Sequence, residues 1–180
     1  MKFTEFGLNP KLLKALEEMG YTEATEIQEK TLQAFNEGKH LLGQSQTWSG
    51  KTAAFLLPVL NQIIPQKRAP QVLILAPTRE LAAQIREEVF SLSKHMYIRS
   101  LAAFGGMSKR KQIDILRSGP QIVVGTPGRI LDLMDRRFLK PNDIKYFILE
   151  ETLSVRCTCA CQIRTSWPWG CQATLEAHRR

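Results

Sequence analysis

One short segment of the sequence combines residue types that bind phosphate. The segment Ser49–Thr52 reads Ser-Gly-Lys-Thr, follows a short apolar pair and opens a stretch with helical periodicity. Backbone N–H groups at a helix N-terminus hold phosphate oxygens, assisted by the helix dipole. Lys51 would reach the β- and γ-phosphates, and the hydroxyl of Thr52 would bind Mg²⁺. The segment therefore predicts a Walker A loop, with an ordinary helix start as the alternative.

Two positions of this loop depart from the full Walker A pattern. Ser45 stands at the first glycine position, and Trp48 lies two residues before Gly50. A glycine at the position of Trp48 would permit a positive φ or a close approach of the backbone to the phosphates. An indole there places a large ring where the nucleotide should lie, so we expect weak nucleotide binding.

The elements that must position this loop follow an alternating pattern. Short apolar runs alternate with amphipathic stretches, which is typical of an α/β fold with a buried parallel sheet. We expect strands at 41–42, 72–76, 101–104, 122–124 and 146–149, and helices at 10–19, 25–36, 51–64, 79–94, 108–118 and 127–136.

Three further polar loops follow apolar strands directly. They are Pro77–Glu80, the pair Gly105-Gly106, and Thr126–Arg129. Open α/β sheets bind ligands at the carboxyl ends of their strands, where these loops should lie. Thr hydroxyls, helix N-termini and two arginines offer donors and charge to phosphate, and paired glycines allow close backbone approach. Each loop alone is equally consistent with a capped turn.

Taken in order and spacing, these segments resemble the DEAD-box helicases over nearly all of residues 1–151. Phe3 and the segment 20–28 are similar to the Q motif of that family, and Gln46–Thr52 is similar to motif I with its middle glycine replaced by Trp48. The three polar loops match motif Ia, the paired-glycine motif and motif Ib.

The resemblance implies a P-loop NTPase domain of the RecA-like type, a three-layer sandwich with a mostly parallel sheet, incomplete at its C-terminal end. It implies ATP and Mg²⁺ as ligands and backbone-directed, sequence-independent binding of single-stranded RNA. The implied ATP-binding residues are Phe3, Tyr21, Gln28, Ser45, Gln46, Thr47, Trp48, Ser49, Gly50, Lys51 and Thr52. The implied RNA-binding residues are Pro77, Thr78, Arg79, Glu80, Gly105, Gly106, Thr126, Pro127, Gly128 and Arg129.

The resemblance breaks at motif II. Where the family has Asp-Glu-Ala-Asp, this chain has Glu150-Glu151-Thr152-Leu153. By resemblance, Glu150 replaces the aspartate that holds Mg²⁺, with Thr52 as the other metal ligand, and Glu151 would polarise the attacking water. Lys51, Glu150 and Glu151 are thus the expected catalytic residues, with Glu150 displaced by one methylene. Motif III, Ser-Ala-Thr, does not follow, and the family's second domain is missing from this sequence.

The composition of the chain changes sharply at about residue 150. We expect one ATP-binding domain over residues 1–150 and an unrelated tail over 151–180, whose origin would be a frameshift, an altered splice or an artificial junction. The tail contains all four cysteines (Cys157, Cys159, Cys161, Cys171) and two of the three tryptophans. With His178 these cysteines are enough for a zinc site, although their spacing is not that of paired structural zinc ligands.

The overall composition agrees with a nucleic-acid partner. The formal net charge is +8 over 180 residues, with 43% hydrophobic residues. A basic excess favours a polyanionic ligand, with a soluble basic enzyme as the alternative. The absence of a signal-like or membrane-spanning apolar run and the cysteine-free first 156 residues predict an intracellular protein without structural disulfides or a membrane partner. The expected compartment is the cytoplasm, or the nucleus in a eukaryote.

Two functions remain open at this stage. One is an ATP-dependent RNA helicase that is partial here and unable to hydrolyse ATP or unwind RNA alone. The other is a non-enzymatic RNA-binding or regulatory fragment. Another P-loop nucleotidase is a third reading, but it leaves motifs Ia and Ib unexplained.

Overall fold

A parallel sheet organises the structure, a computed structural model that describes residues 1–38, 41 and 50–150. Its strands are β1 (Val72–Leu75), β2 (Ser100–Ala103), β3 (Ile122–Gly125) and β4 (Tyr146–Leu149), in the order β2-β3-β1-β4. All neighbouring strands are parallel and pair without an offset, so that Val72 lies beside both Ile122 and Tyr146. The carboxyl ends of the strands therefore lie together at one end of the sheet, here called its carboxyl edge, and the amino ends lie together at the other.

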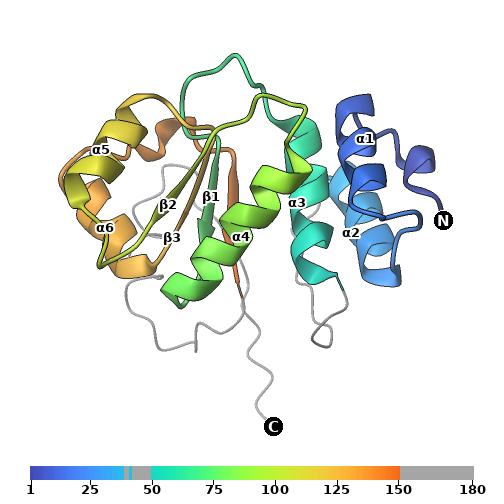
Figure 1. Ribbon diagram of the computed structural model, residues 1–180, viewed down its shortest axis with the longest axis horizontal. Helices are drawn as coiled ribbons and strands as arrows, with labels where there is room; N and C mark the ends of the chain where they lie inside the picture. The colour runs from blue at the N-terminus through green and yellow to red at the C-terminus, as the bar shows by residue number, and fades with distance from the viewer. Residues whose placement is uncertain (39–40, 42–49, 151–180) are drawn as a thin grey trace, which may run out of the picture.

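Within residues 1–38 and 50–150, six α-helices connect and flank these strands (Figure 1). They are α1 (Pro10–Glu18), α2 (Glu26–Asn36), α3 (Lys51–Gln62), α4 (Arg79–Leu92), α5 (Lys109–Arg117) and α6 (Pro127–Asp135). The short 3₁₀ helices η1 (Phe3–Phe6) and η2 (Pro141–Asp143) precede α1 and β4. Figure 1 shows α1 and α2 packed outside α3, on the side away from α5 and α6.

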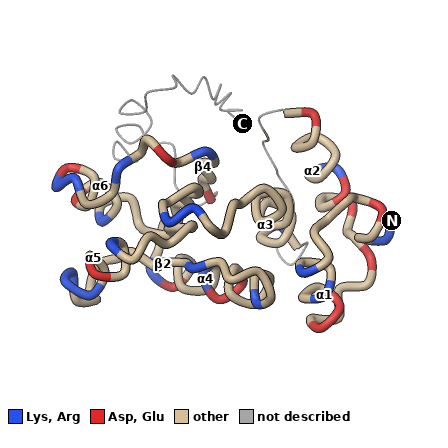
Figure 2. The backbone as a smooth tube through the Cα atoms, turned by 90° about the horizontal axis from the view of Figure 1, so that it is seen from above, with Lys and Arg blue, Asp and Glu red and all other residues tan. Residues whose placement is uncertain are grey.

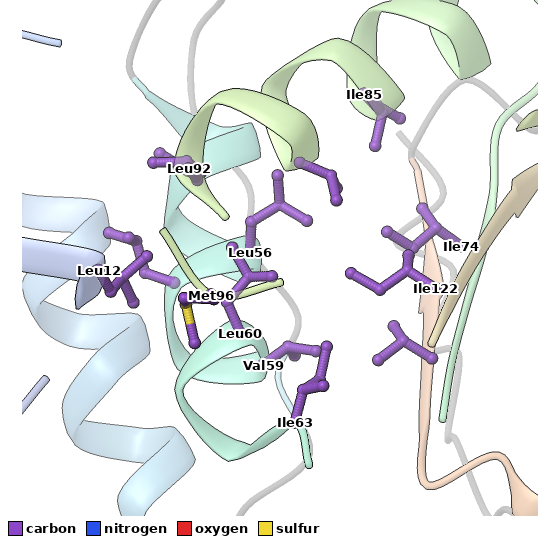
Figure 3. Packing of buried hydrophobic residues seen from close by; sticks show 14 of the residues in the cluster. Leu12, Leu56, Val59, Leu60, Ile63, Ile74, Ile85, Leu92, Met96 and Ile122 are labelled. Carbon is purple, nitrogen blue, oxygen red and sulfur yellow. The ribbon is translucent and has the colours of Figure 1, made fainter. Parts of the chain in front are cut away.

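The alternation of side chains along the strands produces two cores, one on each face of the sheet. Val72 and Ile74 pack with α3 and α4, whereas Leu73 and Leu75 pack with α5 and α6. Figure 3 shows part of the first of these cores, in which Leu56 and Leu60 of α3 and Ile85 of α4 belong to the same cluster as Ile74 and Ile122 of the sheet. Since full burial of such a side chain contributes about 1.5–3 kcal/mol, these two layers fix the arrangement of the helices.

The three-layer architecture and the parallel sheet are confirmed, and the predicted elements from residue 51 to 149 form within one or two residues of their expected ends. The expected strand at 41–42 falls largely on Leu42, outside the described residues, and Leu41 has no regular structure. The tail at 151–180, with its cysteines and His178, also lies outside them. In the parts of the chain that the structure describes, no helix is long and apolar enough to cross a membrane.

Candidate nucleotide- and nucleic-acid-binding site

The N-terminus of α3 has the geometry of a phosphate-binding turn. Gly50 caps the helix with a left-handed φ of 77°, and its carbonyl accepts a hydrogen bond from the N–H of Ala54 at 2.9 Å. A Cβ on this glycine would fall 2.5 Å from Nε2 of Gln28, so both the backbone angle and the space require glycine. Lys51 and Thr52 are the first two residues of the helix and are half-buried.

Gln28 joins this turn to the start of α2. Its side chain is fully buried; Oε1 accepts from the N–H of Thr25 at 3.0 Å, and Nε2 donates to the carbonyl of Gly50 at 3.3 Å. Phe3 is buried in the adjacent core, and Tyr21 packs against the same cluster half-buried. Each atom of the Gln28 amide can form one more hydrogen bond, so reading of adenine stays a prediction.

Glu150 and Thr52 come close to a third residue, Glu88, which the sequence interpretation did not single out. The N–H of Glu150 donates to the carbonyl of Leu75 at 3.0 Å, which places Glu150 at the carboxyl end of β4. Burial raises the pKa of Glu88, the negative charge of Glu150 raises it further, and a hydrogen bond with Thr52 opposes both effects. The available signal was helical spacing, since Glu88 follows the buried Ile85 by three positions on α4.

The donor set beside Thr52 suits Mg²⁺ in kind, because it offers a hydroxyl and carboxylate oxygens. Within the described ranges, no group of three or more His, Cys, Asp or Glu residues could hold a metal ion by itself. Such a site would therefore need the phosphates or water to complete it. The other predicted residues of this region, Ser45, Gln46, Thr47, Trp48, Ser49 and Glu151, lie outside the described residues.

The three polar loops after β1, β2 and β3 meet in one open hollow of about 710 Å³ at the carboxyl edge of the sheet. The strand order places β3 between β1 and β2, which brings the three loops side by side. Predicted residues supply most of the lining, and Asp132 is the addition. The lining residues are Pro77, Thr78, Arg79, Glu80, Gly105, Thr126, Gly128, Arg129 and Asp132.

The side chain of Arg79 packs against the paired glycines. A Cβ on Gly106 would fall 2.6 Å from Nη1 of Arg79, and one on Gly105 would fall 3.2 Å from Nη2. The guanidinium thus lies against this backbone, at a point where Gly106 has a φ of 90°. Thr78 caps α4, its hydroxyl oxygen accepting from the N–H of Leu81 at 3.2 Å, which leaves the O–H proton available to a ligand.

Arg129 is held by two residues that the sequence interpretation did not single out. Its Nη1 donates to Oε1 of the fully buried Gln112 at 3.1 Å, and its Nε lies 4.0 Å from Asp132. Nε2 of Gln112 donates in turn to the carbonyl of Phe104 at 2.9 Å, which links the loop after β2 to Arg129. Pro127 is buried at the start of α6 and does not line the hollow.

Asp132 forms ion pairs with basic side chains at the rim of the hollow. Lys109 lies 2.6 Å and Arg136 lies 2.8 Å from its carboxylate. The hydrogen bond from Lys109, with support from Arg136, lowers the pKa of Asp132. A signal was present in the sequence, because Asp132 follows Arg129 by three positions on one helix. The arrangement can bind an extended anion while keeping its arginines oriented.

Comparison with known proteins identifies the class to which this fold and site belong. The family model described as DEAD/DEAH box helicase matches residues 25–155. Two curated relatives are an ATP-dependent RNA helicase CshA of Listeria monocytogenes, 51% identical over 150 residues, and a DEAD-box ATP-dependent RNA helicase CshA of Streptococcus pneumoniae, 48% identical over 151 residues. The matches cover 83% and 84% of this chain but 29% of each relative.

Solved structures agree with this class. Dbp5 L327V of S. cerevisiae, bound to RNA and ADP BeF3, matches 94% of this chain and 44% of its own with a TM-score of 0.84 and 36% identity. A DEAD box protein from Methanococcus jannaschii matches 83% of this chain and 41% of its own with a TM-score of 0.78 and 37% identity. The chain therefore belongs to the DEAD/DEAH box helicase family, and it spans less than a third of the length of the CshA relatives.

Proposed function

We propose that residues 1–150 form the ATP- and RNA-binding half of a DEAD-box RNA helicase, and that residues 151–180 are a tail outside this domain. The proposal rests mainly on one observation: three loops whose donors and charges suit phosphate line the same hollow. The N-terminus of α3 and Glu150 are positioned to serve a nucleotide on the same sheet. RNA as a ligand is also supported by the similar protein Dbp5, whose structure was solved with RNA bound.

In the proposed nucleotide site, the backbone at the N-terminus of α3 and Lys51 hold the phosphates, and Gln28 contacts the base. Thr52 and Glu150 would hold Mg²⁺, which neutralises phosphate charge when bound. Glu151 would orient water. ATP and RNA are ligands found inside cells, which fits a cytoplasmic or nuclear location.

In the proposed RNA site, Arg79, Thr78 and Arg129 contact phosphates of a single strand. Phosphate contacts carry no sequence information, so binding is sequence-independent. Because Gly105 and Gly106 have no side chain, the guanidinium of Arg79 can lie against the backbone at these positions.

We further propose that this chain binds RNA without hydrolysing ATP by itself. Trp48 disturbs the phosphate loop, and Glu150 carries its carboxylate one methylene beyond the aspartate position of the family. Misplacement of about 1 Å can cost on the order of 10²-fold in rate. In the family a second domain adds arginine fingers, worth about 10³–10⁵ in phosphoryl transfer, and the present chain spans less than a third of the length of its CshA relatives. The same changes favour the second candidate, a non-enzymatic RNA-binding or regulatory fragment.

The test combines RNA binding with phosphate release on the 180-residue chain. We expect a labelled uridine oligonucleotide to bind, Arg129→Ala to weaken binding about tenfold through loss of a charge-assisted contact, and no phosphate release with or without RNA. Lys14→Glu, an exposed change on α1, is the control and should change binding little. Failure of the wild type to bind RNA would overturn the RNA site, whereas RNA-stimulated ATP turnover would overturn the claim of inactivity alone.

A further inference from the structure

A second open hollow lies at the other end of the sheet, where the strands begin, opposite the loops described above. Its volume is also about 710 Å³. It is lined by Phe90 near the end of α4, by the connections that enter β1 and β2, and by Gln121, which precedes β3. These connections lie at the top of Figure 1, and Figure 2 looks down on this end. We propose that this hollow at the amino ends of the strands, here called the amino-end hollow, is a second binding site for single-stranded RNA.

The floor of the amino-end hollow is fixed by hydrogen bonds. Gln121 is 1% exposed; its Nε2 donates to the carbonyls of Pro65 at 2.8 Å and Lys67 at 3.2 Å, and its Oε1 accepts from the N–H of Arg99 at 2.9 Å. Gly119 approaches the backbone of Arg68 so closely that a Cβ on it would fall 2.5 Å from the carbonyl oxygen of Arg68. Because the two connections are tied together before any ligand arrives, little ordering is needed for binding.

The charge of the hollow is complementary to a polyanion. Arg68, Lys94 and Arg99 line it, and no Asp or Glu does so among the described residues. Lys94 is paired with Glu18 at 2.9 Å, and His95 contacts the same carboxylate at 3.0 Å. Over the described part of the chain, neither Arg68 nor Arg99 forms an ion pair, and Nη2 of Arg99 reaches only the carbonyl of Gly119 at 3.5 Å. Two exposed guanidinium groups are therefore available to phosphates.

Two exposed aromatic rings favour a single-stranded nucleic acid over polyanions without bases. Phe90 is 61% exposed and Tyr97 is 84% exposed, and both line the hollow. Tyr97 has a φ of 57°, which is unusual for a bulky residue, and Nζ of Lys11 lies 5.4 Å from its ring centroid. Bases stack on such rings while cations follow the phosphates, with each base contributing about 1–3 kcal/mol by alanine substitution. An acidic peptide would match the arginines but would leave the rings without a function.

The proposal is independent of the hollow at the carboxyl edge, because the two share no lining residue. It also differs from the proposed helicase chemistry, since no nucleotide-binding residue is involved. A strand held at both ends of the sheet would be bound more tightly than one held at either end alone.

The experiment measures binding of a labelled uridine oligonucleotide to the full 180-residue chain. Arg68→Glu and Arg99→Glu should each lower affinity about tenfold, and Phe90→Ala should lower it about fivefold or more. Lys14→Glu makes the same change of charge on α1 and should bind as the wild type does. Arg129→Ala reports separately on the carboxyl-edge hollow, so loss of that site and loss of the amino-end hollow are distinguishable.

Photocrosslinking with 4-thiouridine RNA maps the site directly and does not depend on any variant. We expect crosslinked peptides that contain Phe90 or Tyr97. Crosslinks confined to the loops after the strands, together with Arg68→Glu and Arg99→Glu variants that bind like Lys14→Glu, would overturn the proposal. If poly-glutamate added before irradiation prevented crosslinking as effectively as unlabelled oligouridine does, the proposal would also be overturned, in favour of an acidic protein segment.

Discussion

At the scale of single residues, we expect Trp48 to weaken the binding of ATP to the phosphate loop. It stands where motif I of the family has glycine, next to a helix start that is otherwise intact at Gly50, Lys51 and Thr52. A residue with a Cβ costs about 1–2 kcal/mol if the backbone needs a left-handed angle there. We expect Trp48→Gly to raise ATP affinity at least tenfold, about 1.4 kcal/mol, in isothermal titration. Micromolar affinity in the unchanged chain would contradict this expectation.

We expect Gln112 to affect RNA binding through its hydrogen bond with Arg129. Gln112 accepts from Arg129 at 3.1 Å and donates to the carbonyl of Phe104, so its replacement frees the Arg129 side chain and removes a hydrogen bond to a partly buried carbonyl. We expect Gln112→Leu to weaken RNA binding about three- to tenfold and to lower the free energy of unfolding by about 1–3 kcal/mol. The decisive measurement is a double-mutant cycle: in an Arg129→Ala background the same substitution should change affinity little. Equal losses in both backgrounds would mean that Gln112 acts independently of Arg129.

Asp132 links stability to pH. Lys109 and Arg136 lower the pKa of this carboxyl in the folded chain below its ordinary value of 3.8. The contribution to the free energy of unfolding is therefore present above pH 3.8 and is lost as pH falls through the lower folded pKa. Asp132→Asn should melt a few degrees lower than the wild type at neutral pH. The two melting temperatures should converge in strong acid, and a constant difference at all pH values would show that the ion pairs are not the cause.

At the scale of elements, the close pairing of β2 and β3 depends on Gly125. A Cβ there would fall 2.4 Å from the carbonyl oxygen of Ala103 and 2.7 Å from Cδ1 of Ile130. We expect Gly125→Ala to lower the free energy of unfolding by about 1–3 kcal/mol, because the strand or α6 must shift. Gly128→Ala is the matched control three residues later, since nothing lies within 4 Å of its Cβ position. Denaturant unfolding of both variants distinguishes crowding from a general effect of alanine.

At the scale of the whole molecule, charge is unevenly distributed. Residues 1–38 contain four Lys and seven Glu, whereas residues 50–150 contain 16 Lys or Arg and eight Asp or Glu. Figure 2 shows the acidic segments concentrated around α1 and α2. The basic excess therefore lies on the part built around the sheet, which has the two proposed RNA-binding hollows.

This distribution predicts salt-sensitive, sequence-independent RNA binding. With two or three phosphate contacts at the carboxyl edge and two more from Arg68 and Arg99, the slope of log K against log salt should be about −3, and Arg99→Glu should make it shallower by about 0.7. Anisotropy titrations over a range of KCl concentrations measure both. A preference above about tenfold for one RNA sequence would require contacts to base edges.

The sequence by itself determined the local elements and the positions of the loops. Apolar runs such as Val72–Ala76 and helical spacing such as that of α4 are properties of residues close together in the sequence. They can therefore be recognised without knowing which other elements they pack against. Motif spacing likewise identified eight of the nine residues that line the carboxyl-edge hollow. The 3₁₀ helices η1 and η2 were not predicted, because such short turns have no periodicity.

Only the tertiary structure decided which of these residues meet. The order β2-β3-β1-β4 rests on pairing between strands about 20–75 residues apart, which no local pattern specifies. That order brings Gln112 to Arg129, Glu88 to Thr52 and Glu150, and Arg99 to Gln121. Each of these contacts joins residues from different elements, and their polar side chains resemble ordinary surface residues until the sheet places them together.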